Sequence, residues 1–295
     1  MNIKQFIPPV FIGLFNRLAN SRKSSYRIGK YAIDIPPNFA LPNLQKTTKL
    51  YDRFLPVLAK HLKGSKLIID IGANIGDTTI AMIQQCENPF ICIEPSDIYF
   101  PYLSNNLKRL SPTDIARVKT IKKLVGTGAL SGELDHTVGG TATLKVADGA
   151  TAATHISLDK LIEDTANVLL LKADTDGFDF DVIRSGEKIL SDSEPILFWE
   201  NEITADFQYK GFEALYALLT QKGYKHIYIF DNFGNLMIES GDLELLKDIN
   251  SYVYSMTKYG CTRTIFYTDI LAATDKNELI VKDAIAEYKA KWINQ

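Results

Sequence analysis

Residues 66–77 have the sequence Lys-Leu-Ile-Ile-Asp-Ile-Gly-Ala-Asn-Ile-Gly-Asp, and residues 91–95 follow with Ile-Cys-Ile-Glu-Pro. The apolar run 67–71 predicts a buried strand. Gly72 and Gly76 predict a tight turn after it, since glycine tolerates positive φ and close approach to a ligand. We therefore expect a strand, a glycine turn, a helix from residue 77 or 78, and a second strand that ends in an acid.

The acid at the end of the second strand is Glu94. A carboxylate at that position can accept hydrogen bonds from a ribose diol, and a helix N-terminus supplies free N–H groups and positive dipole. The sequence therefore predicts an adenosine-containing cofactor at the carboxyl edge of a parallel sheet. We expect Asp70, Gly72, Asn74 and Gly76 to surround it together with Glu94.

The turn differs from the dinucleotide fingerprint, which has three glycines. Asn74 stands at one glycine position, and Asp77 would place a negative charge where a pyrophosphate usually lies. S-Adenosylmethionine, with its sulfonium and amino-acid group and no phosphate, tolerates that acid better than NAD does. The glycine pattern thus favours S-adenosylmethionine, although glycines after a strand can also serve only to turn the chain.

A second polar group follows the apolar strand 168–173. Lys172, Asp174 and Asp176 come at its carboxyl end, and the next predicted strand ends in Glu200. Acids at neighbouring strand ends are costly unless they are paired, hydrated or used. We expect a polar site there, with Asp174 and Glu200 as catalytic candidates and His155 as a weaker one. The alternative is structural: Asp174 caps a helix, and Lys172 neutralises a neighbour.

Together these segments resemble the FkbM family of S-adenosylmethionine-dependent methyltransferases. The family pattern has a strand with D-x-G-A-N-x-G, a second ending in E-P, a later S/T-L-D, a K-x-D-x-E-G-x-E turn, and an acid after the fifth strand. The matching positions are Asp70 to Gly76, Glu94-Pro95, Ser157 to Asp159, Lys172 to Asp179, and Glu200. Asp176 and Asp179 stand where the family usually has glutamate.

The resemblance implies methyl transfer to a hydroxyl of a sugar or a polyketide. In the family pattern Gly72, Asn74 and Gly76 wrap the methionine portion, and Glu94 holds the ribose. The adenine contact is expected around 127–130. An alcohol must also lose a proton, which requires a base or a metal. A divalent ion held by Asp174, Asp176 and Glu200 is compatible with the sequence, but the spacing does not predict one.

The rest of the chain alternates predicted helices and strands, which indicates an α/β doubly wound Rossmann-like sheet, mostly parallel with an antiparallel edge strand. We expect a methyltransferase domain over 45–270, an N-terminal segment over 1–44 and a C-terminal helix over 271–295. Within the domain, the predicted helices include 50–62, 99–110 and 211–223. The predicted strands include 118–125, 226–230 and 264–268, and residues 126–154 are expected to form a loose hairpin.

Composition narrows the function classes. The chain has 295 residues and a formal net charge of −2, so its overall field gives no reason to expect nucleic-acid binding. Three scattered cysteines form neither a disulfide framework nor a metal-ligand spacing, which favours the reducing cytoplasm. Trp199, Phe207, Tyr209 and Tyr259 could contact an acceptor, but aromatic residues in such domains usually belong to the core.

The first 33 residues differ from this neutral average, because they carry six basic side chains and no acid. Ile3, Phe6, Ile7, Val10, Phe11, Leu14, Phe15 and Leu18 recur at helical intervals. Residues 1–30 could therefore bind an anionic membrane at the inner face, or pack on the domain or a second copy. For the whole protein we expect a glycan methyltransferase; the alternatives are a natural-product methyltransferase, an NAD-dependent oxidoreductase and a non-catalytic module.

Overall fold

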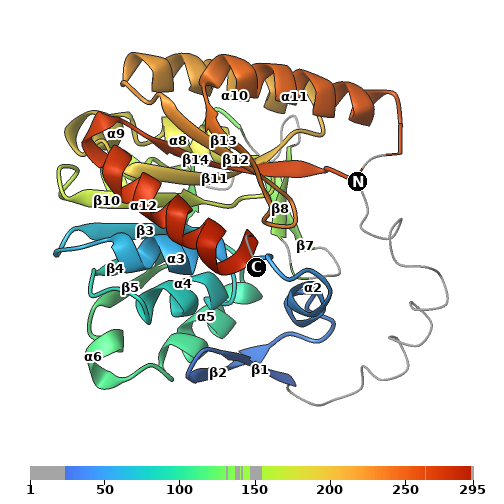
Figure 1. Cartoon of the computed structure of the whole chain (residues 1–295). Coiled ribbons are helices and arrows are strands. Elements are labelled where there is room, and N and C mark those ends of the chain that lie inside the picture. The colour runs from blue at the N-terminus through green and yellow to red at the C-terminus, as the bar shows by residue number, and fades with distance from the viewer. Residues whose placement is uncertain are drawn as a thin grey trace.

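The computed structural model describes residues 24–130, 132–136, 140, 142–146, 155–262 and 264–293. Its centre is an eight-stranded sheet with the order β13-β12-β14-β11-β10-β3-β4-β5. Neighbouring strands from β11 through β5 pair in parallel, and β14, β12 and β13 extend the sheet by antiparallel pairs (Figure 1). The prediction of a doubly wound, mostly parallel sheet is therefore confirmed. The strands of this sheet are β3 (Leu67–Ile71), β4 (Phe90–Ile93), β5 (Val118–Ile121), β10 (Val168–Ala173), β11 (Ile196–Glu202), β12 (His226–Asp231), β13 (Leu236–Gly241) and β14 (Tyr267–Ala273).

Smaller elements surround this sheet. Three two-stranded sheets pair β1 (Ser24–Ile28) with β2 (Tyr31–Ile35), β6 (Leu124–Val125) with β9 (His155–Ile156), and β7 (Gly132–His136) with β8 (Ala142–Val146). The predicted strand 118–125 is thus wrong in its extent, since β5 ends at Ile121 and β6 belongs to another sheet. The hairpin expected within 126–154 is present as β7 and β8, although part of that range lies outside the described residues.

Helices cover both faces of the sheet (Figure 1). One hydrophobic cluster joins the sheet to helices that include α3, α4, α5 and α12, and a second joins the other face to α7 through α11. The helices are α2 (Leu41–Thr47), α3 (Phe54–His61), α4 (Asp77–Ile83), α5 (Tyr99–Leu107), α6 (Pro112–Ile115), α7 (Leu158–Leu161), α8 (Asp179–Arg184), α9 (Glu187–Asp192), α10 (Asp206–Gln221), α11 (Leu243–Lys258) and α12 (Glu278–Tyr288), with short turns η2 (Asp275–Asn277) and η3 (Lys289–Ile293).

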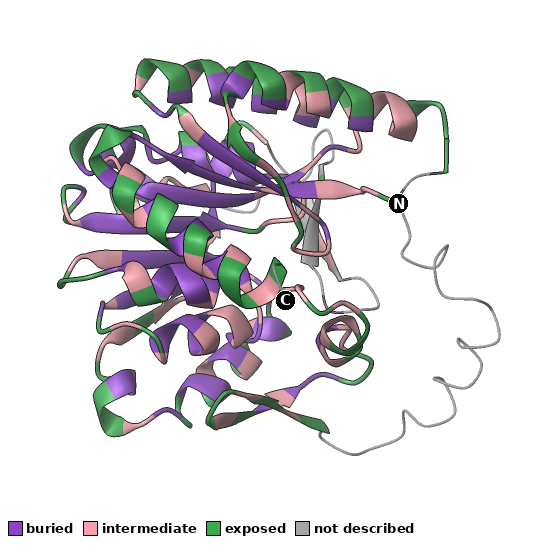
Figure 2. Ribbon diagram, in the orientation of Figure 1, coloured by how far each residue is buried: buried purple, intermediate pink, exposed green. Residues whose placement is uncertain are grey.

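The central strands are apolar because both of their faces are covered (Figure 2). All six residues of β10 are buried, and Lys172 is the only charged one among them. Successive residues of β3, and of β10 from Leu170 onward, belong to alternate clusters: Ile68 and Leu170 contribute to one, and Ile69 and Leu171 to the other. This alternation puts Asp70 and Lys172, which continue the first series, on the face that α4 covers.

Two predicted helices begin at different residues in the structure, and the helix expected over 99–110 ends at Leu107. The helix expected from residue 50 begins at Phe54, because Asp52 lies at a φ of 58° and breaks the helical path. Pro56 then falls in the first turn, where proline is tolerated. The helix expected from Gly211 begins instead at Asp206, because the Gln208 side chain accepts hydrogen bonds from the backbone N–H groups of Thr204 and Ala205.

The hairpin of β1 and β2 and the helix α12 also pack on the domain. Ile33 and Ile35 of the first hairpin are buried in the cluster that contains α12. The Tyr288 hydroxyl of α12 donates to the Gly234 carbonyl at 2.7 Å. The basic apolar pattern of residues 1–23 lies outside the described residues. No described helix combines the length and the apolar character that crossing a membrane requires.

Candidate functional site

The turn after β3 alternates between ordinary and left-handed backbone conformations. Gly72, Asn74 and Gly76 have φ values of 71°, 49° and 86°. Glycine and asparagine are the residues that adopt this region most easily, which explains the spacing of the three positions. Gly76 is the N-cap of α4, so this turn delivers the chain directly into a helix N-terminus.

Gly72 also lies against the turn after β10. A Cβ atom at this position would be 1.8 Å from the backbone oxygen of Asp174. The Asp174 N–H donates to the Ile71 carbonyl at 3.1 Å, so the two turns are joined through their backbones as well. The two polar stretches singled out in the sequence, about 100 residues apart, therefore form one site at the carboxyl edge of the sheet.

Glu94 ties the end of β4 to the glycine turn. It is 4% exposed, and its carboxylate accepts one hydrogen bond from the Asn74 N–H at 2.8 Å and another from the Ser96 N–H at 2.9 Å. Burial raises the pKa of Glu94, whereas these two N–H groups act to lower it. Each carboxylate oxygen keeps a further lone pair that is available to a ribose hydroxyl. The ribose contact expected of Glu94 stays a prediction.

Asp70 is completely buried beneath the turn. One of its oxygens accepts from the Thr79 hydroxyl of α4 at 2.5 Å, and the other lies 2.9 Å from the Lys172 ammonium. Lys172 also contacts Asp174 at 3.3 Å. The sequence-based expectation that Asp70 lies close to the cofactor turn agrees with this position, but a direct contact with a cofactor stays a prediction.

Carboxylates line the adjoining part of the edge. Asp176, Glu200 and Glu202 bring one oxygen each to within 4.8 Å of one another, close enough to hold a metal ion. Burial is the largest cause of the raised pKa of Glu200, and the charge of Asp174 is the next. Asp174 and Glu200, the predicted catalytic pair, are therefore neighbours in this charged region.

Two features of this edge were missed in the sequence. Asp269 lies directly opposite Glu200 in the antiparallel pairing of β11 with β14. Burial raises the pKa of Asp269, with the charge of Asp174 as the second cause. Tyr51 comes from the segment before α3, and its pKa is raised by Asp52, by burial and then by Asp174, Glu200 and Asp269. No local motif marks either residue, since only β14 and the α2–α3 connection bring them here.

Other predicted contacts lie elsewhere. His155 belongs to β9, where it lies beside Gly126, and no contact within the described part of the chain joins its ring to Asp174 or Glu200. Trp199 is buried, Tyr209 stacks on Tyr254, and Tyr259 is 77% exposed. Phe207 packs against Phe178, which follows the turn after β10, with ring centroids 5.8 Å apart.

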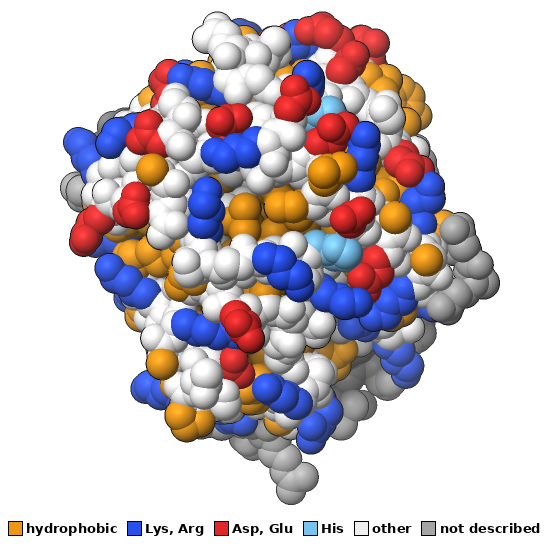
Figure 3. Space-filling model, turned by 60° about the vertical axis from the view of Figure 1, so that its left-hand side comes forward, with side chains coloured by type: hydrophobic (Ala, Val, Ile, Leu, Met, Phe, Trp, Pro, Cys, Tyr) orange, Lys and Arg blue, Asp and Glu red, His pale blue; other side chains and the backbone are white. Residues whose placement is uncertain are grey.

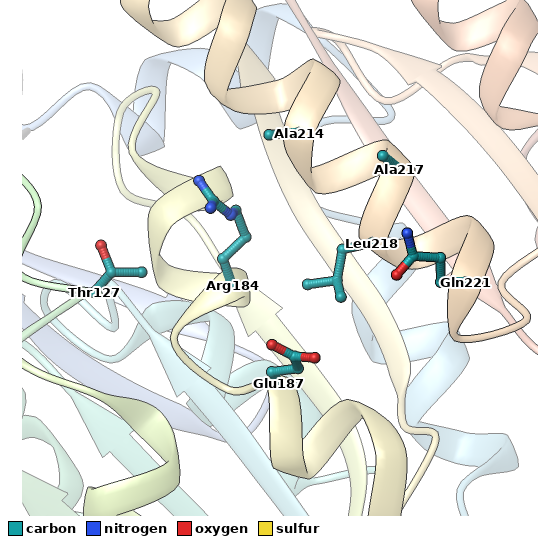
Figure 4. A pocket seen from close by; sticks show the side chains of 7 residues that line it. All are labelled: Thr127, Arg184, Glu187, Ala214, Ala217, Leu218 and Gln221. Carbon is teal, nitrogen blue, oxygen red and sulfur yellow. The ribbon is translucent and has the colours of Figure 1, made fainter.

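The expected adenine region 127–130 begins with a residue that is already engaged. The Thr127 N–H and hydroxyl both donate to the Asp181 carboxylate of α8. Thr127 also lines a cavity of about 400 Å³ between α8, α9 and α10, into which the Arg184 side chain extends (Figure 4). This cavity lies among the helices of the second hydrophobic cluster and does not include the turn at Gly72. The adenine contact stays a prediction.

Residues 70–226, more than half of the chain, match the family model described as "Methyltransferase FkbM domain". The chain belongs to the FkbM methyltransferase family. The match begins at Asp70 and includes the glycine turn, Glu94 and both catalytic candidates, so the resemblance stated from the sequence is confirmed. No curated protein is similar enough to be matched.

Solved structures related to this FkbM chain are distant. The FkbM methyltransferase from Methylobacillus flagellatus KT has 13% identity and a TM-score of 0.44, over 79% of this chain and 58% of that one. A precorrin-6y C5,15-methyltransferase from Geobacter metallireducens GS-15 has 12% identity and a TM-score of 0.38, over 74% and 84%. A SAM-dependent methyltransferase from Aquifex aeolicus has 9% identity and a TM-score of 0.37, over 79% and 96%.

Proposed function

We propose that this protein is an S-adenosylmethionine-dependent O-methyltransferase whose acceptor is a sugar hydroxyl of a bacterial surface glycan or lipid-linked oligosaccharide. The observation that carries the proposal is the contact between the two turns: Gly72 of the FkbM cofactor motif lies against Asp174 of the acidic motif. Family membership supports methyl transfer, and the acids beside the turn support a hydroxyl as the acceptor, because an alcohol must give up a proton.

The turn has features that fit this cofactor. Gly72 allows the backbones of the two turns to meet, and the Asn74 side-chain oxygen is buried without a hydrogen-bond partner among the described residues. A donor such as the ammonium of an amino-acid group would satisfy that oxygen. The Asn74 side chain would therefore hold the methionine portion, and Glu94 the ribose.

When bound, S-adenosylmethionine supplies an electrophilic methyl group. The protein must then align an acceptor oxygen and accept its proton. Asp174 is suited to accepting the proton, because its side chain is 52% exposed and its backbone lies against Gly72 of the cofactor turn. Glu200 lies deeper than Asp174. Its raised pKa means that its carboxylate takes up a proton at a higher pH than an ordinary carboxylate does.

The test is a mass-spectrometric assay on bacterial glycans and lipid-linked oligosaccharides incubated with S-adenosylmethionine, with and without EDTA. We expect a gain of one methylene mass on an acceptor sugar, and a large loss of transfer in Asp174→Asn. Loss of transfer in EDTA would show that a divalent ion is required, with Asp176, Glu200 and Glu202 as its candidate ligands. Full transfer by Asp174→Asn would remove Asp174 from the mechanism.

The same measurements separate the alternatives. Transfer only to a polyketide-type hydroxyl would favour a natural-product acceptor. Calorimetry should show binding of S-adenosylmethionine and none of NAD, and tight binding of NAD alone would contradict the proposal. Cofactor binding without transfer to any acceptor would favour a non-catalytic module.

We also propose that the protein acts in the cytoplasm and contacts the inner membrane through residues 1–30, where lipid-linked acceptors reside. The support is the sequence of that segment, with its basic residues and regularly spaced apolar ones. Elsewhere charge is mixed: Figure 3 shows acidic and basic side chains interspersed over one face of the molecule.

In a flotation assay, the full chain should bind vesicles rich in phosphatidylglycerol. A variant with Arg17→Glu, Arg22→Glu and Lys23→Glu should lose most of that binding, because charge attraction near a membrane is worth about 1 kcal/mol per basic residue. The control reverses three basic residues outside the segment, Lys188, Lys210 and Lys247. Equal binding by both variants would contradict a membrane contact through the basic residues of this segment.

A further inference from the structure

Lys172 occupies an enclosed position of the site. It lies in β10, between Asp70 of β3 and Phe198 of β11 in the parallel ladder, and is 3% exposed. A buried ammonium is costly unless carboxylates surround it. Burial by itself would lower the pKa of Lys172, but the charges of Asp70 and Asp174 outweigh it and raise the pKa above the usual value. Lys172 therefore stays charged at every physiological pH.

Its ammonium joins separate parts of the site. Nζ lies 2.9 Å from an Asp70 oxygen and 3.3 Å from an Asp174 oxygen, and it donates to the Gly72 carbonyl at 3.3 Å. Asp70 is in turn fixed by Thr79 of α4. Lys172 is thus the link between the strand before the cofactor turn, the turn itself, and the acid after β10. Among the described residues it is the side-chain partner of the Asp174 carboxylate.

The charge of Lys172 also acts on the surrounding carboxyl groups. Burial raises the pKa of Asp77 to about 6 and also raises the pKa of Glu94, and in both cases Lys172 opposes the shift. The same opposition applies to Asp52 and Asp269. The titratable groups that this charge affects come from several elements of the site: Asp52, Asp70, Asp77, Cys92, Glu94, Asp174 and Asp269.

We propose that Lys172 is the positioning residue of the site: its ammonium fixes Asp174 against the cofactor turn and supplies the positive charge around which the acids of this edge are arranged. This inference rests on the proposed function, because it takes the turn to be the cofactor site. It differs from a role in stability alone, in which Lys172 would only neutralise the buried Asp70.

The test compares two variants that differ at one position. Asp70→Asn leaves Lys172 with Asp174 as its carboxylate partner. Asp70→Asn combined with Lys172→Met removes both members of the buried pair, which avoids an unpaired buried charge. Binding of S-adenosylmethionine is measured by calorimetry from pH 5 to pH 9, and thermal unfolding is followed in parallel. If the double variant does not fold, Lys172→Gln replaces Lys172→Met, since two amides can hydrogen-bond in place of the ion pair.

We expect the double variant to melt close to Asp70→Asn but to bind S-adenosylmethionine about tenfold more weakly at pH 7. As the solution is acidified, the double variant should lose S-adenosylmethionine binding at a higher pH than Asp70→Asn does. The carboxyl groups around position 172 lack the cation that favours their charged forms, so they take up protons at a higher pH. Equal affinity and equal pH dependence in the two variants would overturn the inference. Failure of the wild-type protein to bind S-adenosylmethionine would instead contradict the proposed function.

Discussion

At the scale of single residues, the alternation at 72, 74 and 76 connects the sequence most directly to the site. The sequence identifies these positions because few residues tolerate positive φ. It does not show that Gly72 is needed for a second reason, the carbonyl of Asp174. That contact depends on the pairing of β3 with β10, which joins residues about 100 positions apart.

Substituting Gly72 tests this contact. In Gly72→Ala the new methyl group would collide with the Asp174 oxygen, 1.8 Å from the Cβ position, and the residue would be strained at a φ of 71°. We expect a loss of more than about 2 kcal/mol in the free energy of unfolding and a weakening of S-adenosylmethionine binding by at least about tenfold. Urea denaturation and calorimetry measure the two effects.

Gly64→Ala is the matched control. Gly64 has a φ of 91°, and nothing lies within 4 Å of the position of its Cβ. The control should therefore show the cost of backbone strain alone, about 1–2 kcal/mol, with cofactor binding unchanged. If both variants lose the same stability and bind the cofactor equally well, Gly72 has no role beyond its conformation.

At the scale of elements, α10 shows how tertiary contacts change a sequence-based boundary. Glycines at 211 and 223 suggest helix ends, since glycine is common there. In the structure Gly211 lies inside the helix, because a Cβ at that position would be 2.4 Å from the Phe180 ring of α8. Gly211 is therefore required for packing between two helices, and sequence alone does not distinguish this use from a terminus.

Gly211→Ala should accordingly destabilise the protein. Alanine in a helix is normally favoured over glycine by about 1 kcal/mol, but here the added methyl would overpack the Phe180 contact and cost about 1–3 kcal/mol. Urea denaturation measures the change. Ala214→Gly, at an exposed position of the same helix, reports the intrinsic preference and should cost about 1 kcal/mol. A stabilised Gly211→Ala would contradict the packing argument.

The boundaries of the strands, like those of the helices, are only partly predictable from the sequence. Continuous apolar runs identify the central parallel strands well, since burial on both faces leaves little room for other types. The sequence predicts a strand at 264–268 and pairing with 226–230. The bounds of this prediction are wrong, since β14 spans Tyr267–Ala273 and residues 226–230 pair with 269–273. The strand is inserted between β11 and β12. That insertion brings Asp269 to the site.

At the scale of the whole molecule, the acids of the site make stability depend on pH. Asp179 is completely buried, and burial raises its pKa from 3.8 to about 7. The folded protein therefore keeps a proton that the unfolded chain releases above about pH 4. Since stability falls with pH wherever the folded state binds more protons, the contribution of Asp179 favours folding at acidic pH and is lost as pH rises toward 7.

We therefore expect Asp179→Asn to flatten the stability curve between pH 4 and pH 7 and to increase the free energy of unfolding at pH 8 by on the order of 2 kcal/mol. Denaturation with urea at several pH values measures the effect. Asp283→Asn, on the exposed face of α12, is the control and should leave the curve unchanged. Parallel curves for wild type and Asp179→Asn would contradict the assigned role of burial.

The sequence by itself determined the class of fold, the position and conformation of the glycine turn, and the family. These follow from local physics: periodic burial, the few residues that accept positive φ, and acids at strand ends. Only the tertiary structure decided which groups meet. It brought Gly72 against Asp174, connected both to Lys172, and set Asp269 beside Glu200. These contacts depend on the order in which strands pair across the sheet, which no local segment encodes.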